Sequence, residues 1–130
     1  MLRIALRCKR HDRFMLVTDA MPSVGTGQKS FQLQGRSITV EGSACVDEDG
    51  NLAGSHMDMS GAVRNSVSML GLALPDAVRM ASLHPATFLG LAQDVGRIAA
   101  GQRANLVPAD DQLEVRETWI DGIPSGTLKG

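Results

Sequence analysis

The sequence predicts an α/β protein on three observations. Four consecutive apolar residues, Phe14 to Val17, lead into Thr18 and Asp19. Such a run is typical of a strand buried on both faces of a parallel sheet. Between residues 30 and 51 apolar and polar residues alternate, which predicts a β-meander. Residues 58–91 carry apolar residues at helical spacing, which predicts helices after the meander.

Composition narrows the functional classes. The chain has 130 residues, long enough for one domain with a core, and a net charge of −1 from 13 basic and 14 acidic residues. With this balance and few aromatic residues, we expect no nucleic-acid partner. No apolar run approaches the ~20 residues of a membrane span, so no membrane partner is expected. Cys8 and Cys45 stand apart, as free thiols of a cytoplasmic protein would.

The first residues read as the end of a helix. Residues 2–10 mix apolar residues with four cations, and no capping residue precedes them, so we expect the chain to begin inside an element. The run at 14–18 would need strand neighbours on both sides, and the sequence offers no second run of that kind close by. These features predict the end of a larger α/β protein.

The middle of the chain is predicted in more detail. The meander has strands around 31–33, 38–40 and 44–46, and Asp49-Gly50 is a strong hairpin-turn signal. A helix capped by Asp58 or Ser60 should run to Gly71. A second helix should start at Pro75 and run through Ser82, and a third should run from Pro85 to Leu91 after a break at His84-Pro85.

The last part of the chain is predicted to be β-structure. We expect strands at 104–107 and 113–120, with Val115 and Trp119 as core candidates, and a loose tail over 125–130. Four methionines at or near helical positions are expected to fill the core: Met57, Met59, Met69 and Met80.

Asp19 stands where the first strand should end. In parallel α/β folds, catalytic groups gather at the carboxyl ends of strands. From its position alone, Asp19 is either a catalytic carboxylate or a turn residue with a capping role.

Several segments, in order along the chain, together resemble a known family. They are 16–21 (Leu-Val-Thr-Asp-Ala-Met), 42–47, 52–55 (Leu-Ala-Gly-Ser), 59–65, 80–86 (Met-Ala-Ser-Leu-His-Pro-Ala), 89–91 and 96–107. Over residues 2–122 the chain resembles the N-acetylglucosamine-6-phosphate deacetylases of the amidohydrolase superfamily. The last two segments, 89–91 and 96–107, resemble the superfamily generally, and the Thr-Asp-Ala strand with its meander resembles the deacetylases themselves.

The resemblance implies a fold and a division of the chain into parts of that fold. The family fold is a (β/α)8 barrel with a small β-sandwich. Residues 1–102 would be the end of the barrel, with the last barrel strand, helices and a meander insertion at about 30–54. Residues 103–123 would be C-terminal sandwich strands and 124–130 a tail. The metal-binding Glu and two His of the family would precede this region, so no metal ligand is assigned here.

The resemblance also implies a reaction and its residues. The acetamide of N-acetylglucosamine 6-phosphate would be hydrolysed with a divalent metal such as zinc, in amino-sugar catabolism. Asp19 matches the catalytic acid that takes a proton from the metal-activated water and gives it to the leaving amine. Leu52, Ala53 and Gly54 match a segment that contacts substrate, although a simple strand exit explains them equally well. The phosphorylated amino sugar would be the substrate partner, and the family implies a homo-oligomer, a dimer.

Some residues are expected to have structural roles. His56 reads as an exposed loop histidine, with sugar contact as the alternative, and His84 as a turn residue before Pro85. The acids at 47–49 read as a solvated hairpin turn, and Cys45 as a small buried residue.

Two alternatives to a deacetylase stay open. One is a non-catalytic remnant or association module. The other is a different hydrolase of the amidohydrolase superfamily, and the meander is evidence against this second alternative. The chain alone is expected to be inactive, because the metal ligands that the family uses do not map onto it.

Overall fold

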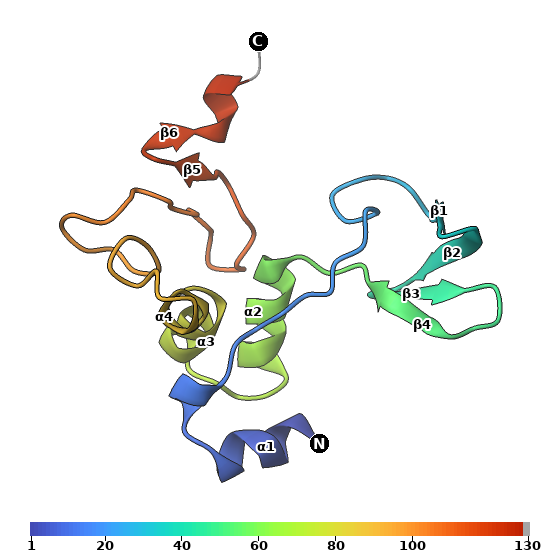
Figure 1. Ribbon diagram of the computed structural model, residues 1–130, viewed down its shortest axis with the longest axis horizontal. Coiled ribbons are helices and arrows are strands. Elements are labelled where there is room, and N and C mark those ends of the chain that lie inside the picture. Colours follow the sequence, from blue (N-terminus) through green and yellow to red (C-terminus); the bar gives the residue numbers. More distant parts are fainter. Residues whose placement is uncertain (129–130) are drawn as a thin grey trace. The chain divides into compact units, whose positions relative to one another are not determined.

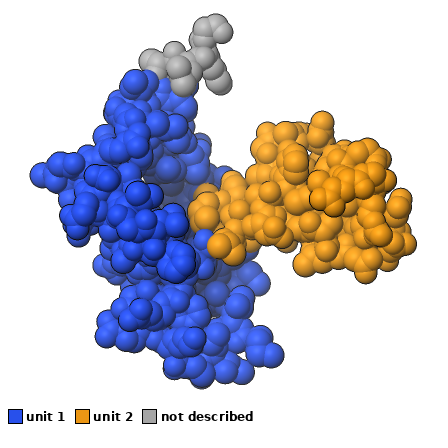
Figure 2. Space-filling view, viewed as in Figure 1, with its two compact units in different colours: residues 1–16, 63–130 blue, residues 17–62 orange. Residues whose placement is uncertain are grey.

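The computed structural model describes residues 1–128 and has a mixed α/β architecture, as the sequence predicts. The chain divides into two compact units, residues 17–62 and residues 1–16 with 63–130 (Figure 2). Among the described residues, no helix is long and apolar enough to cross a membrane. The finer division into barrel, sandwich strands and tail stays a prediction.

Residues 17–62 contain the meander. Its strands are β1 (Ser30–Leu33), β2 (Arg36–Glu41), β3 (Ala44–Asp47) and β4 (Leu52–Ser55). They form one antiparallel sheet in the order β1-β2-β3-β4 (Figure 1). Successive side chains of a strand point to opposite faces of the sheet, and Ile38 and Cys45 lie on buried positions, with 2% and 0% of their surface exposed. The meander and the burial of Cys45 are therefore confirmed.

The β3–β4 turn is organised around Asp47. Its carboxylate accepts the backbone N–H groups of Asp49 at 3.1 Å and Asn51 at 2.8 Å, and it pairs with the Arg36 guanidinium at 2.8 Å. The bonds from Asn51, followed by those from Asp49 and Arg36, lower the pKa of Asp47 below its ordinary value. The acids at 47–49 thus form a hydrogen-bonded hairpin turn.

This turn predicts an acid-sensitive contribution to stability. A carboxyl whose pKa is lowered by folding stabilises the fold above its ordinary pKa of 3.8, and the stabilisation is lost as the pH falls through the folded-state pKa. We expect Asp47→Asn to lower the urea midpoint at pH 6 and to reduce its fall below pH 4. Glu48→Gln, in the same exposed turn, is the matched control. Equal midpoints for the two variants at pH 6 would contradict this role.

The helices belong mainly to the other unit. They are α1 (Leu2–Cys8), the short 3-10 helix η1 (His11–Arg13), α2 (Met59–Ser68), α3 (Leu74–Ala81) and α4 (Leu83–Phe88). The Asp58 carboxylate caps α2 by accepting a hydrogen bond from the Gly61 N–H at 2.7 Å. The prediction of Asp58 as a capping residue is therefore confirmed. α3 carries Pro75 in its first turn, as predicted.

The break between α3 and α4 lies earlier than predicted. It occurs at Ser82, where φ is −132° and ψ is −71°, rather than at His84-Pro85. Pro85 instead lies in the first turn of α4. Backbone N–H groups in the first turn of a helix make no hydrogen bond within the helix, so proline, which lacks the N–H, is tolerated there. His84 is therefore a helical residue of α4 and not the turn residue that was predicted, and its Nδ1 hydrogen-bonds with the Phe14 carbonyl at 2.9 Å.

The core of residues 1–16 and 63–130 is small. Ala77, Met80 and Ala86 are 0%, 1% and 6% exposed. Met80 thus confirms its predicted core position, whereas Met59 and Met69 are 37% and 61% exposed and do not fill a core. Apolar spacing alone marks a face of a helix, and only a packed neighbour makes that face a core.

The strand predicted at 14–18 is not formed. Residues 14–18 are extended but belong to no sheet, and Val17 is 81% exposed. Within its own unit the segment is held by the Leu16 N–H, which donates to the Met80 carbonyl at 2.9 Å. A strand is stabilised by its partners, and an apolar run without them stays a single extended segment.

The predicted C-terminal strands are also mostly absent. Residues 104–107 and 113–118 form only isolated bridges, Leu106 with Trp119 and Ala109 with Val115. Regular pairing is confined to β5 (Trp119–Ile120) and β6 (Ile123–Pro124), followed by the 3-10 helix η2 (Ser125–Leu128).

Two local features interrupt the C-terminal pairing. Pro108 has no N–H to donate, and the Asp110 carboxylate binds the N–H groups of Gln112 and Glu114 in a turn. Val115 and Trp119 are 44% and 36% exposed, so they are not core residues. The tail expected from 125 is helical to 128, and residues 129–130 lie outside the described part.

Candidate functional site

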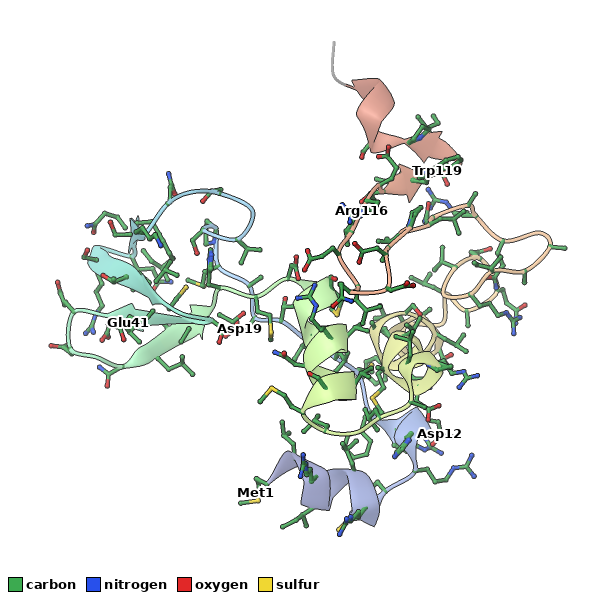
Figure 3. All side chains as sticks on the ribbon, turned by 180° about the vertical axis from the view of Figure 1, so that it is seen from behind. Met1, Asp12, Asp19, Glu41, Arg116 and Trp119 are labelled. Carbon is green, nitrogen blue, oxygen red and sulfur yellow. The ribbon has the colours of Figure 1, made fainter. Side chains whose placement is uncertain are left out.

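Asp19 lies where the extended segment meets the end of β4 (Figure 3). Its carbonyl accepts the Ser55 N–H at 2.9 Å, and the Met21 N–H donates to the Ser55 carbonyl at 2.9 Å. The Ser55 hydroxyl donates to the Thr18 carbonyl, and Ala20 forms a parallel bridge with Ser55. One residue of β4 therefore holds the backbone on both sides of Asp19.

These contacts of Ser55 with residues 18–21 form a clamp on the backbone, the Ser55 clamp. The Asp19 side chain lies at the surface beside it. The residue is exposed, and no other described residue donates a hydrogen bond to its carboxylate. Its φ of +50° lies in the left-handed region, which aspartate tolerates better than most residues. Strained backbone of this kind gathers at functional sites. The arrangement leaves a carboxylate on a fixed backbone, available to a bound molecule.

Gly54 is the member of the predicted substrate segment that approaches Asp19. It is buried, with φ of +148°, and a Cβ there would lie 2.6 Å from the Met21 Cγ and Sδ atoms and 3.2 Å from the Asp19 carbonyl oxygen. Only glycine allows this close approach. The structure therefore brings Gly54 to the Asp19 segment.

The other two residues of that segment are placed differently. Leu52 pairs with Val46 and is 76% exposed. Ala53 is half-buried within β4. The segment is a strand, β4, in the structure, and a role of Leu52 and Ala53 in binding substrate stays a prediction.

Two residues near the clamp had no clear signal in the sequence. His56 lies in a loop, as predicted, but it is half-buried rather than exposed, which corrects that part of the prediction. Its Nδ1 lies 2.9 Å from the Ser23 hydroxyl, and that hydroxyl lies 3.7 Å from the Cys45 sulfur. Ser23, in the loop before β1, is fully buried. Ser23 and His56 are 33 positions apart, and no local sequence pattern predicts a hydrogen bond between residues so distant in the chain.

The described residues do not form a metal centre by themselves. They contain no group of three or more His, Cys, Asp or Glu side chains that could hold a metal ion. The residues present thus do not fit a complete metal site, and we assign no metal ligand to this chain.

Residues 4–127 match the amidohydrolase family. The N-acetylgalactosamine-6-phosphate deacetylase of Shewanella sp. (strain ANA-3) is 42% identical over 118 residues, which are 91% of this chain and 30% of that protein. The human N-acetylglucosamine-6-phosphate deacetylase is 38% identical over 122 residues, 93% of this chain and 30% of that protein.

Similarity extends to solved structures. The crystal structure of N-acetylglucosamine-6-phosphate deacetylase from Pasteurella multocida aligns with a TM-score of 0.89 at 30% identity. The alignment covers 95% of this chain and 32% of that one, so the chain spans about a third of these relatives. The family match covers nearly the whole described chain, and the chain belongs to the amidohydrolase family.

Proposed function

We propose that this chain provides the part of a deacetylase for 6-phosphorylated N-acetylhexosamines that carries the catalytic acid. In this role it would form the end of the barrel, with the meander as an insertion and residues 103–123 contributing to a sandwich. The observation that carries the proposal is the Ser55 clamp, which fixes the backbone of Asp19 and leaves its carboxylate exposed. The relatives named deacetylases support the choice of reaction.

Asp19 would move the protons of amide hydrolysis. Water adds to the acetamide carbonyl carbon, the carbon–nitrogen bond breaks, and acetate and the free amine result. The carboxylate accepts a proton from the attacking water and delivers it to the leaving nitrogen. The resemblance implies a divalent metal that would activate the water in such enzymes, and the described residues contain no group of three or more side chains that could hold it.

The substrate sugar can be either of two epimers, N-acetylglucosamine 6-phosphate or N-acetylgalactosamine 6-phosphate. The relatives carry both named activities: the relative that is 42% identical acts, by name, on N-acetylgalactosamine 6-phosphate, and the one that is 38% identical on N-acetylglucosamine 6-phosphate. The shared class is a 6-phosphorylated N-acetylhexosamine. We propose N-acetylglucosamine 6-phosphate as the first substrate to test and its epimer as the second.

A chimera tests the proposed function. This chain would replace the segment that it matches in the Shewanella deacetylase, where the match covers 30% of that protein. We expect the chimera to release acetate from at least one of the two sugar phosphates. A folded chimera with no activity on either, beside an active parent, would contradict the proposal and favour a non-catalytic association module.

A further inference from the structure

A pocket of about 260 Å³ lies within residues 17–62, between the loop before β1 and the β2–β3 turn. Its lining is Thr26, Gly27, Gln28, Lys29, Val40, Gly42 and His56. The volume lies just below the ~300–1,000 Å³ of typical small-molecule sites, so it suits a small ligand or one end of a larger one.

The lining favours an anion. Lys29 contributes a full positive charge, and none of the lining residues is an acid. Gln28 contributes a polar side chain and His56 an imidazole, whereas the Thr26 hydroxyl already donates to the Ser23 carbonyl at 2.8 Å. Lysine is a common phosphate ligand because its ammonium acts as a compact positive charge with three donors.

His56 is held in one orientation by a buried partner. Its Nδ1 hydrogen-bonds with the Ser23 hydroxyl at 2.9 Å, and its backbone N–H donates to the Ser43 carbonyl at 2.9 Å. Because Nδ1 is engaged, Nε2 is the ring nitrogen left to meet a ligand. Ser23 has 0% exposure and cannot touch a ligand, so it acts as a positioning residue.

We propose that this pocket binds the phosphate group of a small molecule, with the Lys29 ammonium and His56 Nε2 as its recognition groups. The phosphate can belong to inorganic phosphate or to a phosphorylated sugar. The proposal does not rest on deacetylase activity, because binding is measured without turnover.

The test is a titration of the 130-residue chain followed by amide NMR shifts. Three probes are compared: inorganic phosphate, N-acetylglucosamine 6-phosphate and N-acetylglucosamine. We expect both phosphate-bearing probes to shift the amides of Gly27 and Gly42, and the neutral sugar to leave them unchanged. Binding of the sugar phosphate alone would identify a phosphorylated sugar as the source of the group, and binding of both would identify phosphate itself.

Three variants and one control locate the binding. We expect Lys29→Met to weaken it about tenfold or more, as the loss of a charge-assisted hydrogen bond does. His56→Gln should weaken it as well, and Ser23→Ala should do so by releasing the imidazole. Lys9→Met removes the same charge from the exposed residue that follows α1, far from the pocket in sequence, and should leave binding unchanged. No shifts with either phosphate probe, or equal affinity in Lys29→Met and Lys9→Met with the amide spectrum preserved, would overturn the proposal.

Discussion

Asp19→Asn in the active chimera is expected to lower kcat by about 10²–10⁴-fold, the usual cost of losing a positioned general acid/base. The amide keeps the size and a hydrogen-bonding capacity of the carboxylate but cannot take up the proton. The Ser55 clamp acts on backbone atoms, so the substitution should leave the local fold intact. Acetate release measured over a range of substrate concentrations separates kcat from KM, and KM should change little.

Asp49→Asn is the matched control for this prediction. Asp49 is an exposed carboxylate of the β3–β4 turn, and its loss should leave kcat within about twofold, as for a surface substitution away from the chemistry. Near-normal turnover in Asp19→Asn would show that Asp19 is a turn residue held at a positive φ for structural reasons.

Gly54→Ala is expected to disturb both the fold and the site. The new Cβ would lie 2.6 Å from the Met21 Cγ and Sδ atoms and 3.2 Å from the Asp19 carbonyl oxygen, so the Met21 side chain must move and the Asp19 backbone must yield slightly. Overpacking of this kind costs about 1–3 kcal/mol, in addition to the strain of φ at +148°. Urea unfolding of the 130-residue chain measures the loss of stability, and acetate release by the chimera measures the displacement of Asp19.

Gly50→Ala separates the two causes. Gly50 also has a positive φ, +80°, but a Cβ there meets nothing within 4 Å. This control therefore carries backbone strain without the clash, and Gly54→Ala should lower the free energy of unfolding by about 1–3 kcal/mol more. Equal destabilisation by the two variants, with normal activity in both, would show that the close approach of Gly54 to Asp19 has no functional role.

The sequence predicted local elements well where a local signal decides them. The meander follows from alternation and from turn residues such as Asp49-Gly50, and these interactions are close in sequence. The start of α2 follows from Asp58 and the start of α3 from Pro75, since each acts on its own first turn.

Elements that need distant partners were predicted less well. The apolar run at 14–17 and the residues at 104–107 have strand-like composition, but they pair with no continuous strand among the described residues. Strand propensity reflects packing against neighbours more than an intrinsic backbone preference. The same reason explains Met69 and Trp119, whose apolar side chains stay partly or largely exposed.

The sequence by itself determined the α/β class, the meander and the resemblance that singled out Asp19, because alternation, capping and motif order are properties of neighbouring residues. Only the tertiary structure decided that Ser55 clamps the Asp19 backbone, that Gly54 admits this approach, and that buried Ser23 orients His56. Each of these contacts joins residues more than thirty positions apart. Such contacts form only when the meander folds back on the segment that precedes it, and no local pattern in the sequence records them.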